Sequence, residues 1–211
     1  MRPVHPGWMA RRADPTRAII RNWDKARKAL MRASRKITLT AAVVLSLATA
    51  AFAMTRPAEI SGTINATKPY GSGSLTWLFL TVFDASLWTD APQWSMDEPF
   101  ALTLVYRMSF STEELVDSTI DQIQAMSPRI SGQTLTHYRA VLTRVLPPVK
   151  SGHRITVIHS PRAQDRFFHN GRPTGDSQDA AFSEHFFAIW LSPKTPEPRL
   201  RAGLLRLLGQ R

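Results

Sequence analysis

The sequence predicts an α+β domain, because segments with the alternating pattern of strands stand before and after segments with helical spacing. Two strand segments come first, two helices follow, strands return, and two helices end the chain. Alternation of apolar and polar residues is typical of half-buried strands, and spacings of three and four residues are typical of amphipathic helices. Strands and helices that are grouped in this way favour an α+β architecture.

Two long strands are predicted at the start of the domain. The first runs from Leu75 to Trp88, after a polar entry and a glycine-rich segment, 70–74. The glycines lack the third glycine of a dinucleotide-binding loop and precede a strand, so we interpret them as a turn or bulge entering that strand. The second strand starts at Phe100 and has an apolar residue at every second position as far as Phe110.

Two helices follow the second strand. Ser111 and Glu114 have the spacing of a capping box, which predicts a helix from that point, with Val116, Ile120, Ile123 and Met126 on one stripe. Ser127-Pro128 ends it. The second helix is predicted from about Gln133 to Val145, before a pair of prolines.

The last part of the domain combines a hairpin with two helices. Strands are predicted at 154–159 and 166–169, and Asn170-Gly171 is the favoured pair for a tight hairpin turn. Asp179 caps a helix whose inner face carries phenylalanines and Trp190. A final helix is predicted from about Glu197 to Leu208, with its inward residues at Leu200, Leu204 and Leu207.

The chain's formal net charge of +11 is concentrated in residues 1–53, which hold eleven of its 27 basic residues and two of its 16 acidic ones. The remainder has a net charge of +2, which argues against a nucleic-acid partner. Residues 37–53 are uncharged, follow three basic residues and end with Ala51-Phe52-Ala53. Basic residues before an apolar run that ends in small residues are typical of a secretory signal peptide.

We therefore expect export to the periplasm, with cleavage after Ala53. Translation from Met31 would give a signal of ordinary length, so either Met1 or Met31 could be the true start. An uncleaved apolar run would instead serve as a membrane anchor, and we expect membrane contact only through this segment. Residues 54–67 are expected to be a polar linker and 68–211 the folded domain.

The sequence shows few signals for metal or cofactor chemistry. It has no cysteine, and its histidines form none of the close ligand pairs typical of metal sites. His159 and His169 are expected on neighbouring strands of one hairpin, which could bring their rings together. Adjacent carboxylates such as Glu113 and Glu114 suit helix caps better than acid-base catalysis. We predict no metal and no cofactor.

Three polar side chains are candidates for ligand binding. Thr81 and Tyr106 each lie within an otherwise apolar strand face, so their hydroxyls need partners if buried, either in the protein or on a ligand. An ordinary hydrogen-bonded core hydroxyl is the alternative for each. Arg107, on the other strand face, could bind an anionic group or extend to solvent.

The order of several stretches resembles bacterial chalcone isomerase-like proteins over residues 68–208. These stretches are the Gly-x-Gly entry at Gly71, the strand VFDASLW, the turn HNGR, and the helix FFAIWL with its Ser-Pro stop. The resemblance implies an open-faced β-sandwich, in which a large antiparallel sheet packs against a layer of helices with a ligand cleft between them.

The resemblance also implies two kinds of function. Plant enzymes of this superfamily close a flavanone ring with an arginine near the glycine-rich entry, a threonine on the next strand, and a tyrosine and an asparagine in the cleft. Non-enzymatic members bind fatty acids, with the arginine meeting the carboxylate. Here residues 71–76 contain no arginine, Thr81 lies close to the family threonine, and the tyrosine and asparagine have no clear counterpart.

From these departures we predict a non-catalytic protein that binds a small apolar or amphipathic molecule, a lipid or an aromatic compound. The first alternative is an isomerase, or intramolecular lyase, in which Arg107 or another arginine replaces the missing one. The second is an envelope protein that docks a protein partner through its terminal helix.

Overall fold

The computed structural model describes residues 55–77 and 79–207. The expected signal segment, its cleavage site at Ala51 and Ala53, and both candidate start residues lie outside the described residues. In the described part of the chain, no helix is long and apolar enough to cross a membrane.

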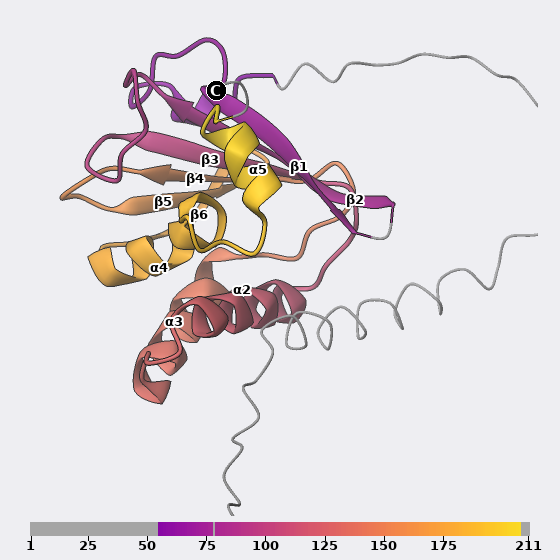
Figure 1. Ribbon diagram of the computed structural model, residues 1–211, viewed down its shortest axis with the longest axis vertical. Helices are drawn as coiled ribbons and strands as arrows, with labels where there is room; N and C mark the ends of the chain where they lie inside the picture. The colour runs from indigo at the N-terminus through magenta and orange to yellow at the C-terminus, as the bar shows by residue number, and fades with distance from the viewer. Residues whose placement is uncertain (1–54, 78, 208–211) are drawn as a thin grey trace, which may run out of the picture. The chain divides into compact units, whose positions relative to one another are not determined.

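The centre of the domain is a six-stranded sheet in which each strand pairs antiparallel with the next along the chain. Figure 1 shows this sheet from its first strand in purple to its last in orange. The strands are β1 (Gly71–Trp77), β2 (Leu80–Thr89), β3 (Phe100–Tyr106), β4 (Arg154–His159), β5 (Asp165–His169) and β6 (Arg172–Ser177). This arrangement confirms the predicted α+β class and the open antiparallel sheet.

Four described helices pack on one face of the sheet. They are α2 (Thr112–Met126), α3 (Gly132–Val145), α4 (Ala180–Leu191) and α5 (Pro198–Leu204). Helix α2 contacts α3 and α4, α3 contacts β6, and α5 lies along β1 (Figure 1). The strand face below them is apolar because alternate residues of each strand point to the same side.

The local signals for helix ends and for one turn are confirmed. Ser111 and Glu114 form both bonds of the capping box at the start of α2. The Asp179 side chain accepts the backbone N–H of Phe182 at the start of α4. Asn170 and Gly171 have φ angles of 51° and 82°, which the tight hairpin turn between β5 and β6 requires.

The prediction of one strand from Leu75 to Trp88 is wrong. The segment is a hairpin of β1 and β2, and Phe79 lies in its turn with a φ of 71°. The glycine-rich segment is part of β1 itself rather than a turn before it. The turn escaped prediction because it contains none of the Gly, Asn or Asp residues that normally adopt positive φ.

The glycines of β1 allow a close approach of helix α5. A Cβ added at Gly71 would collide with the backbone oxygen of Leu204, and one at Gly73 would come within 2.9 Å of the Leu200 side chain. Gly203 faces the backbone of Ser72 in the same way. The helix backbone therefore rests directly on the strand backbone, a packing that any larger residue would prevent.

Two other predicted boundaries differ from the structure. Strand β3 ends at Tyr106, and Phe110 forms only an isolated bridge to Val149. Helix α5 ends at Leu204, because Arg206 adopts a φ of 53° and turns the chain away. Leu207, predicted to point inward, is 40% exposed as a result.

The face of the sheet opposite the helices is partly covered by the first described residues. Ile60 and Ile64 pack with Trp88, Ala101 and Ile158 in a buried cluster. The side chain of the adjacent Glu59 is almost fully buried and accepts hydrogen bonds from Arg154 and Thr156. The segment 54–67 was expected to be a polar linker, but its residues Ile60 and Ile64 belong to the core.

Candidate functional site

A small cavity lies between the sheet and the helices. Its volume is about 30 Å³, close to the space of one water molecule. Strands β3 and β4 supply its floor, and helices α2 and α4 supply most of its other wall. The lining residues are Leu102, Leu104, Tyr106, Leu115, Thr119, Leu146, Ile155, Val157, Phe186 and Trp190. The interior at this position is therefore enclosed, apolar and nearly filled.

Tyr106 contributes the most distinctive group to this cavity. Tyr106 is the last residue of strand β3. Its ring makes edge contacts with the rings of Phe83 and Phe110, with centroid distances of 5.9 Å and 6.0 Å. Only 7% of the residue is exposed. Burial raises the pKa of Tyr106 above its ordinary value, so the group is a neutral phenol that can donate a hydrogen bond.

The second polar residue of the cavity is already satisfied. The Thr119 hydroxyl donates to the backbone oxygen of Leu115, one turn earlier in α2, at 2.8 Å. Such a bond removes the donor from competition for a ligand. The Tyr106 phenol and the indole N–H of Trp190 are the other side-chain donors in this lining.

The other two predicted site residues lie outside the cavity lining. Thr81 is half-buried on β2 and pairs with Thr76 of β1, close to the hairpin turn. The Arg107 guanidinium binds Asp84, with 2.7 Å between Nε and Oδ2, on the face of β2 opposite Phe83. Of the three candidates, only Tyr106 reaches the space between sheet and helices.

Sequence reasoning missed a buried polar network between the sheet and α4. His159 Nδ1 lies 2.6 Å from Asp165 Oδ1, and Ser183 donates to the other oxygen of Asp165. Nε2 of His159 donates to the Met96 backbone oxygen at 2.9 Å. Asp165 is 1% exposed. No local signal could reveal this network, because its members come from four separate parts of the chain.

This network has the residue types of a hydrolase triad but not its geometry. Serine and histidine both bind the same carboxylate, whereas a catalytic serine must donate to the histidine that activates it. Both ring nitrogens of His159 face oxygen acceptors, which suits the charged imidazolium. The arrangement is a buried ion pair that joins β4, β5 and α4.

The predicted approach of His159 and His169 is wrong. In the β4–β5 hairpin, His159 pairs with Asp165 and His169 pairs with Ile155, so the two histidines lie at opposite ends. His169 instead meets His153, with 2.9 Å between Nε2 and Nδ1. Over residues 55–77 and 79–207, no group of three or more His, Cys, Asp or Glu residues could hold a metal ion.

The ion pair predicts a specific pH dependence of stability. Burial alone lowers the pKa of His159, but the hydrogen bond and charge of Asp165 and the Met96 carbonyl together raise it above the ordinary value. A raised pKa stabilises the fold fully below the unfolded pKa of about 6.5, and this contribution is lost as the pH rises through the folded pKa. Urea unfolding should therefore show lower stability at about pH 8.5 than at about pH 6.

The matched variant for this measurement is His159→Gln. Its stability should change less over the same pH interval than that of the wild type, because the titrating pair is gone. Equal changes in both proteins would mean that His159 is not charged in the folded state.

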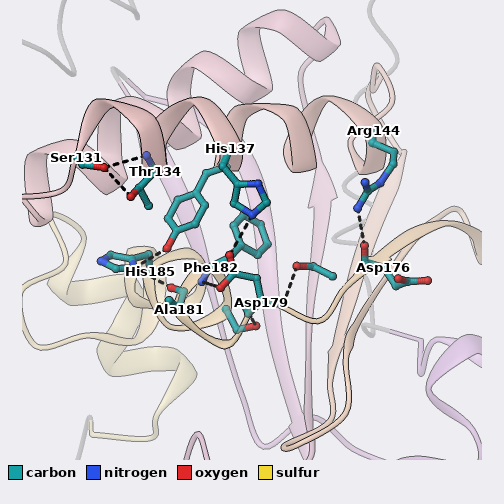
Figure 2. Close-up of polar contacts among 12 residues, drawn as sticks. Ser131, Thr134, His137, Arg144, Asp176, Asp179, Ala181, Phe182 and His185 are labelled. Atoms are coloured by element: carbon teal, nitrogen blue, oxygen red, sulfur yellow. Dashed lines mark hydrogen bonds and ion pairs between the residues drawn. The ribbon is translucent and has the colours of Figure 1, made fainter.

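A wider depression lies on the surface, where the loop between α2 and α3 faces the start of α4 (Figure 2). Its volume is about 580 Å³, and its lining includes Ile130, Tyr138 and His185. Figure 2 shows that its polar groups bind one another: His185 Nδ1 donates to the Ala181 oxygen at 2.7 Å and lies 3.3 Å from the Tyr138 hydroxyl. This depression is open to solvent, and the hydroxyl of its tyrosine, Tyr138, already has a hydrogen-bond partner.

The fold and the enclosed cavity define an open-faced α+β sandwich with an apolar space between one antiparallel sheet and a layer of helices. The family model described as chalcone isomerase-like matches residues 68–206, and the chain belongs to that family. A solved structure with the same fold is that of a fatty-acid binding protein of Arabidopsis thaliana. The two chains are 9% identical with a TM-score of 0.51, and the match covers 65% of this chain and 86% of the other. The comparison with curated proteins finds no match.

Proposed function

We propose that the protein is an exported, non-catalytic member of the chalcone isomerase-like family that binds a small apolar or amphipathic molecule between the sheet and helices α2 and α4. The observation that carries the proposal is the apolar cavity between sheet and helices, with the buried Tyr106 phenol in its lining. A ligand atom that accepts a hydrogen bond from this phenol inside an apolar cavity would add to the affinity. A solved structure with the same fold is that of a fatty-acid binding protein, which supports a ligand of this kind.

The cavity lining supports binding rather than catalysis. Tyr106 is the only ionisable residue in it, and burial raises the pKa of that phenol. Ring closure of a phenolate needs a positive group close to the developing charge. The nearest candidate from the sequence, Arg107, binds Asp84 on the other side of the sheet.

The cavity volume sets a condition on the ligand. A space of about 30 Å³ holds one water-sized group, so a longer molecule requires α2 and α4 to separate from the sheet. Large side chains such as Leu115, Phe186 and Trp190 would have to change their packing in the process. Ligand binding should therefore be accompanied by a measurable movement of these helices.

Export is the second part of the proposal and rests on the leader sequence. Three basic residues precede the uncharged run 37–53, which ends with Ala51-Phe52-Ala53. Native mass spectrometry of protein recovered from the periplasm tests both parts together. It should show a chain that starts at Met54 and carries an apolar molecule.

Replacing Tyr106 by phenylalanine tests the contribution of its hydroxyl to ligand binding. In a titration with cis-parinaric acid, a fluorescent fatty acid, Tyr106→Phe should weaken binding roughly two- to tenfold, the contribution of one hydrogen bond.

The matched control is Tyr138→Phe. Tyr138 is equally buried, but its hydroxyl contacts His185 and it does not line the cavity. This variant should leave probe binding unchanged. Failure of the wild type to bind the probe, or equal effects of the two variants, would contradict the proposed site. Conversion of a chalcone to a flavanone by the purified protein would favour the isomerase instead.

A further inference from the structure

The turn between β1 and β2 exposes large apolar side chains. Phe79 is 99% exposed and Leu80 is 51% exposed. Phe79 also has a φ of 71°, a conformation that glycine or asparagine adopts at lower cost and that is an outlier for a bulky residue. An aromatic residue that is both fully exposed and held in an unfavourable backbone conformation suggests a role outside the fold.

Exposed basic residues lie at the same end of the sheet. Because all strands pair antiparallel, the β1–β2 turn lies at the same edge of the sheet as three other segments. These are the last residue of β3, Tyr106, the start of β4, and the turn between β5 and β6. Lys150 lies in the turn before β4. The N–H of Gly152 in the same turn donates to the backbone oxygen of Tyr106. Arg172 starts β6. Neither side chain forms an ion pair with any residue in the described ranges, and both are exposed.

Two acidic side chains at this end are already neutralised. Asp84 binds Arg107, and Glu59 binds Arg154. The exposed basic residues at this end are Lys150 and Arg172, and the exposed Glu113 follows Phe110, which bridges to Val149 beside Lys150. The two basic residues outnumber this one carboxylate. Figure 1 shows the β1–β2 hairpin projecting at this end of the sheet, so the apolar turn is a convex tip and not the wall of a groove.

We propose that this tip, formed by Phe79 and Leu80, inserts into the surface of an anionic lipid bilayer, with Lys150 and Arg172 on the lipid phosphates. Apolar side chains partition into the boundary between headgroups and acyl chains, and flanking basic residues are attracted to anionic lipids. A second copy of the chain fits less well, because it would present the same positive charge.

This contact would also orient the candidate ligand site. Phe83 of β2 lies three residues from Leu80, and its ring contacts Tyr106 at the edge of the cavity. The bilayer would then lie at the end of the sheet that carries Tyr106. Insertion itself does not depend on the proposed function, because the tip lies outside the cavity. Binding of the tip to a bilayer can therefore be measured without any ligand in the cavity.

The absence of native cysteine allows a site-specific test with the full chain. Leu80→Cys, labelled with a fluorophore whose emission rises in apolar surroundings, keeps Phe79 and reports the environment of the tip itself. Vesicles of phosphatidylcholine with phosphatidylglycerol should raise its emission severalfold, and pure phosphatidylcholine should raise it much less. The label distinguishes insertion of the tip from attachment through residues 37–53.

Two further variants test the assigned residues in the Leu80→Cys background. Phe79→Ser should weaken the response to vesicle concentration roughly tenfold or more, as loss of a buried aromatic side chain predicts. Lys150→Gln and Arg172→Gln should each weaken it about fivefold at low salt. Arg129→Gln is the matched control, since Arg129 is an exposed arginine in the loop between α2 and α3.

Leu207→Cys provides the positional control. Leu207 is exposed and follows Arg206, whose guanidinium lies over the Tyr70 ring at the opposite end of β1. A label there should not respond to the vesicles. An unchanged signal at position 80, or an equal response at position 207, would overturn the proposal. The emission of the label at position 80 could instead rise with protein concentration when no vesicles are present. If Phe79→Ser removed that rise, the tip would be assigned to self-association.

Discussion

Asp165→Ala is expected to lower the free energy of unfolding by about 3–5 kcal/mol, a range typical of a broken buried ion pair. Asp165 is 1% exposed and binds both His159 and Ser183. Removing the carboxylate leaves the His159 ring buried, with an N–H that has lost its acceptor. It also removes the acceptor of the Ser183 hydroxyl on helix α4. Chemical denaturation near pH 6, where His159 is charged, measures the loss.

Two comparisons separate the ion pair from simpler causes. Asp176→Ala removes an aspartate from the neighbouring strand β6, where the side chain is exposed, and should change stability by less than about 0.5 kcal/mol. Asp165→Asn retains the shape and one acceptor oxygen, so it should cost less than Asp165→Ala. A loss below about 1 kcal/mol in Asp165→Ala would show that the network contributes little to the fold.

Local chemistry allowed much of this fold to be predicted from the sequence. Ser111 and Asp179 cap helices because their side-chain oxygens accept first-turn N–H groups, and both contacts involve residues only three positions apart. Asn170-Gly171 defines a turn for a similarly local reason. Tyr106 was identified as a site candidate because strand alternation alone placed its hydroxyl on an apolar face.

Features that depend on distant contacts could not be predicted in the same way. The partner of Arg107 is Asp84, on another strand, and the two bind on the face away from the cavity. His159 was expected to approach His169, but the hairpin register gives it Asp165 instead. The β1–β2 turn was missed for a different reason, since Phe79 adopts a backbone conformation that its residue type disfavours.

The same limitation explains why Gly71 and Gly73 were interpreted as a turn. Glycine is common in turns, and the alternative, close packing of a helix onto a strand, involves residues about 130 positions later in the chain. In the structure, Gly203 of α5 faces Ser72 between the two glycines of β1, so the backbones of helix and strand meet there. Glycine is thus needed at these positions because the interface between β1 and α5 leaves no room for a Cβ atom.

Gly71→Ala is accordingly expected to lower the free energy of unfolding by about 3 kcal/mol, at the upper end of the usual cost of overpacking. The new Cβ would overlap the backbone oxygen of Leu204, and a backbone atom cannot move aside as a flexible side chain can. Gly132→Ala is the matched control, because Gly132 starts α3 with no atom near its Cβ position and should lose no stability. If Gly71→Ala also leaves stability unchanged, α5 does not rest on β1. If it displaces α5 while the remaining domain still unfolds cooperatively, hydrogen exchange should show loss of protection confined to α5 and the edge strand.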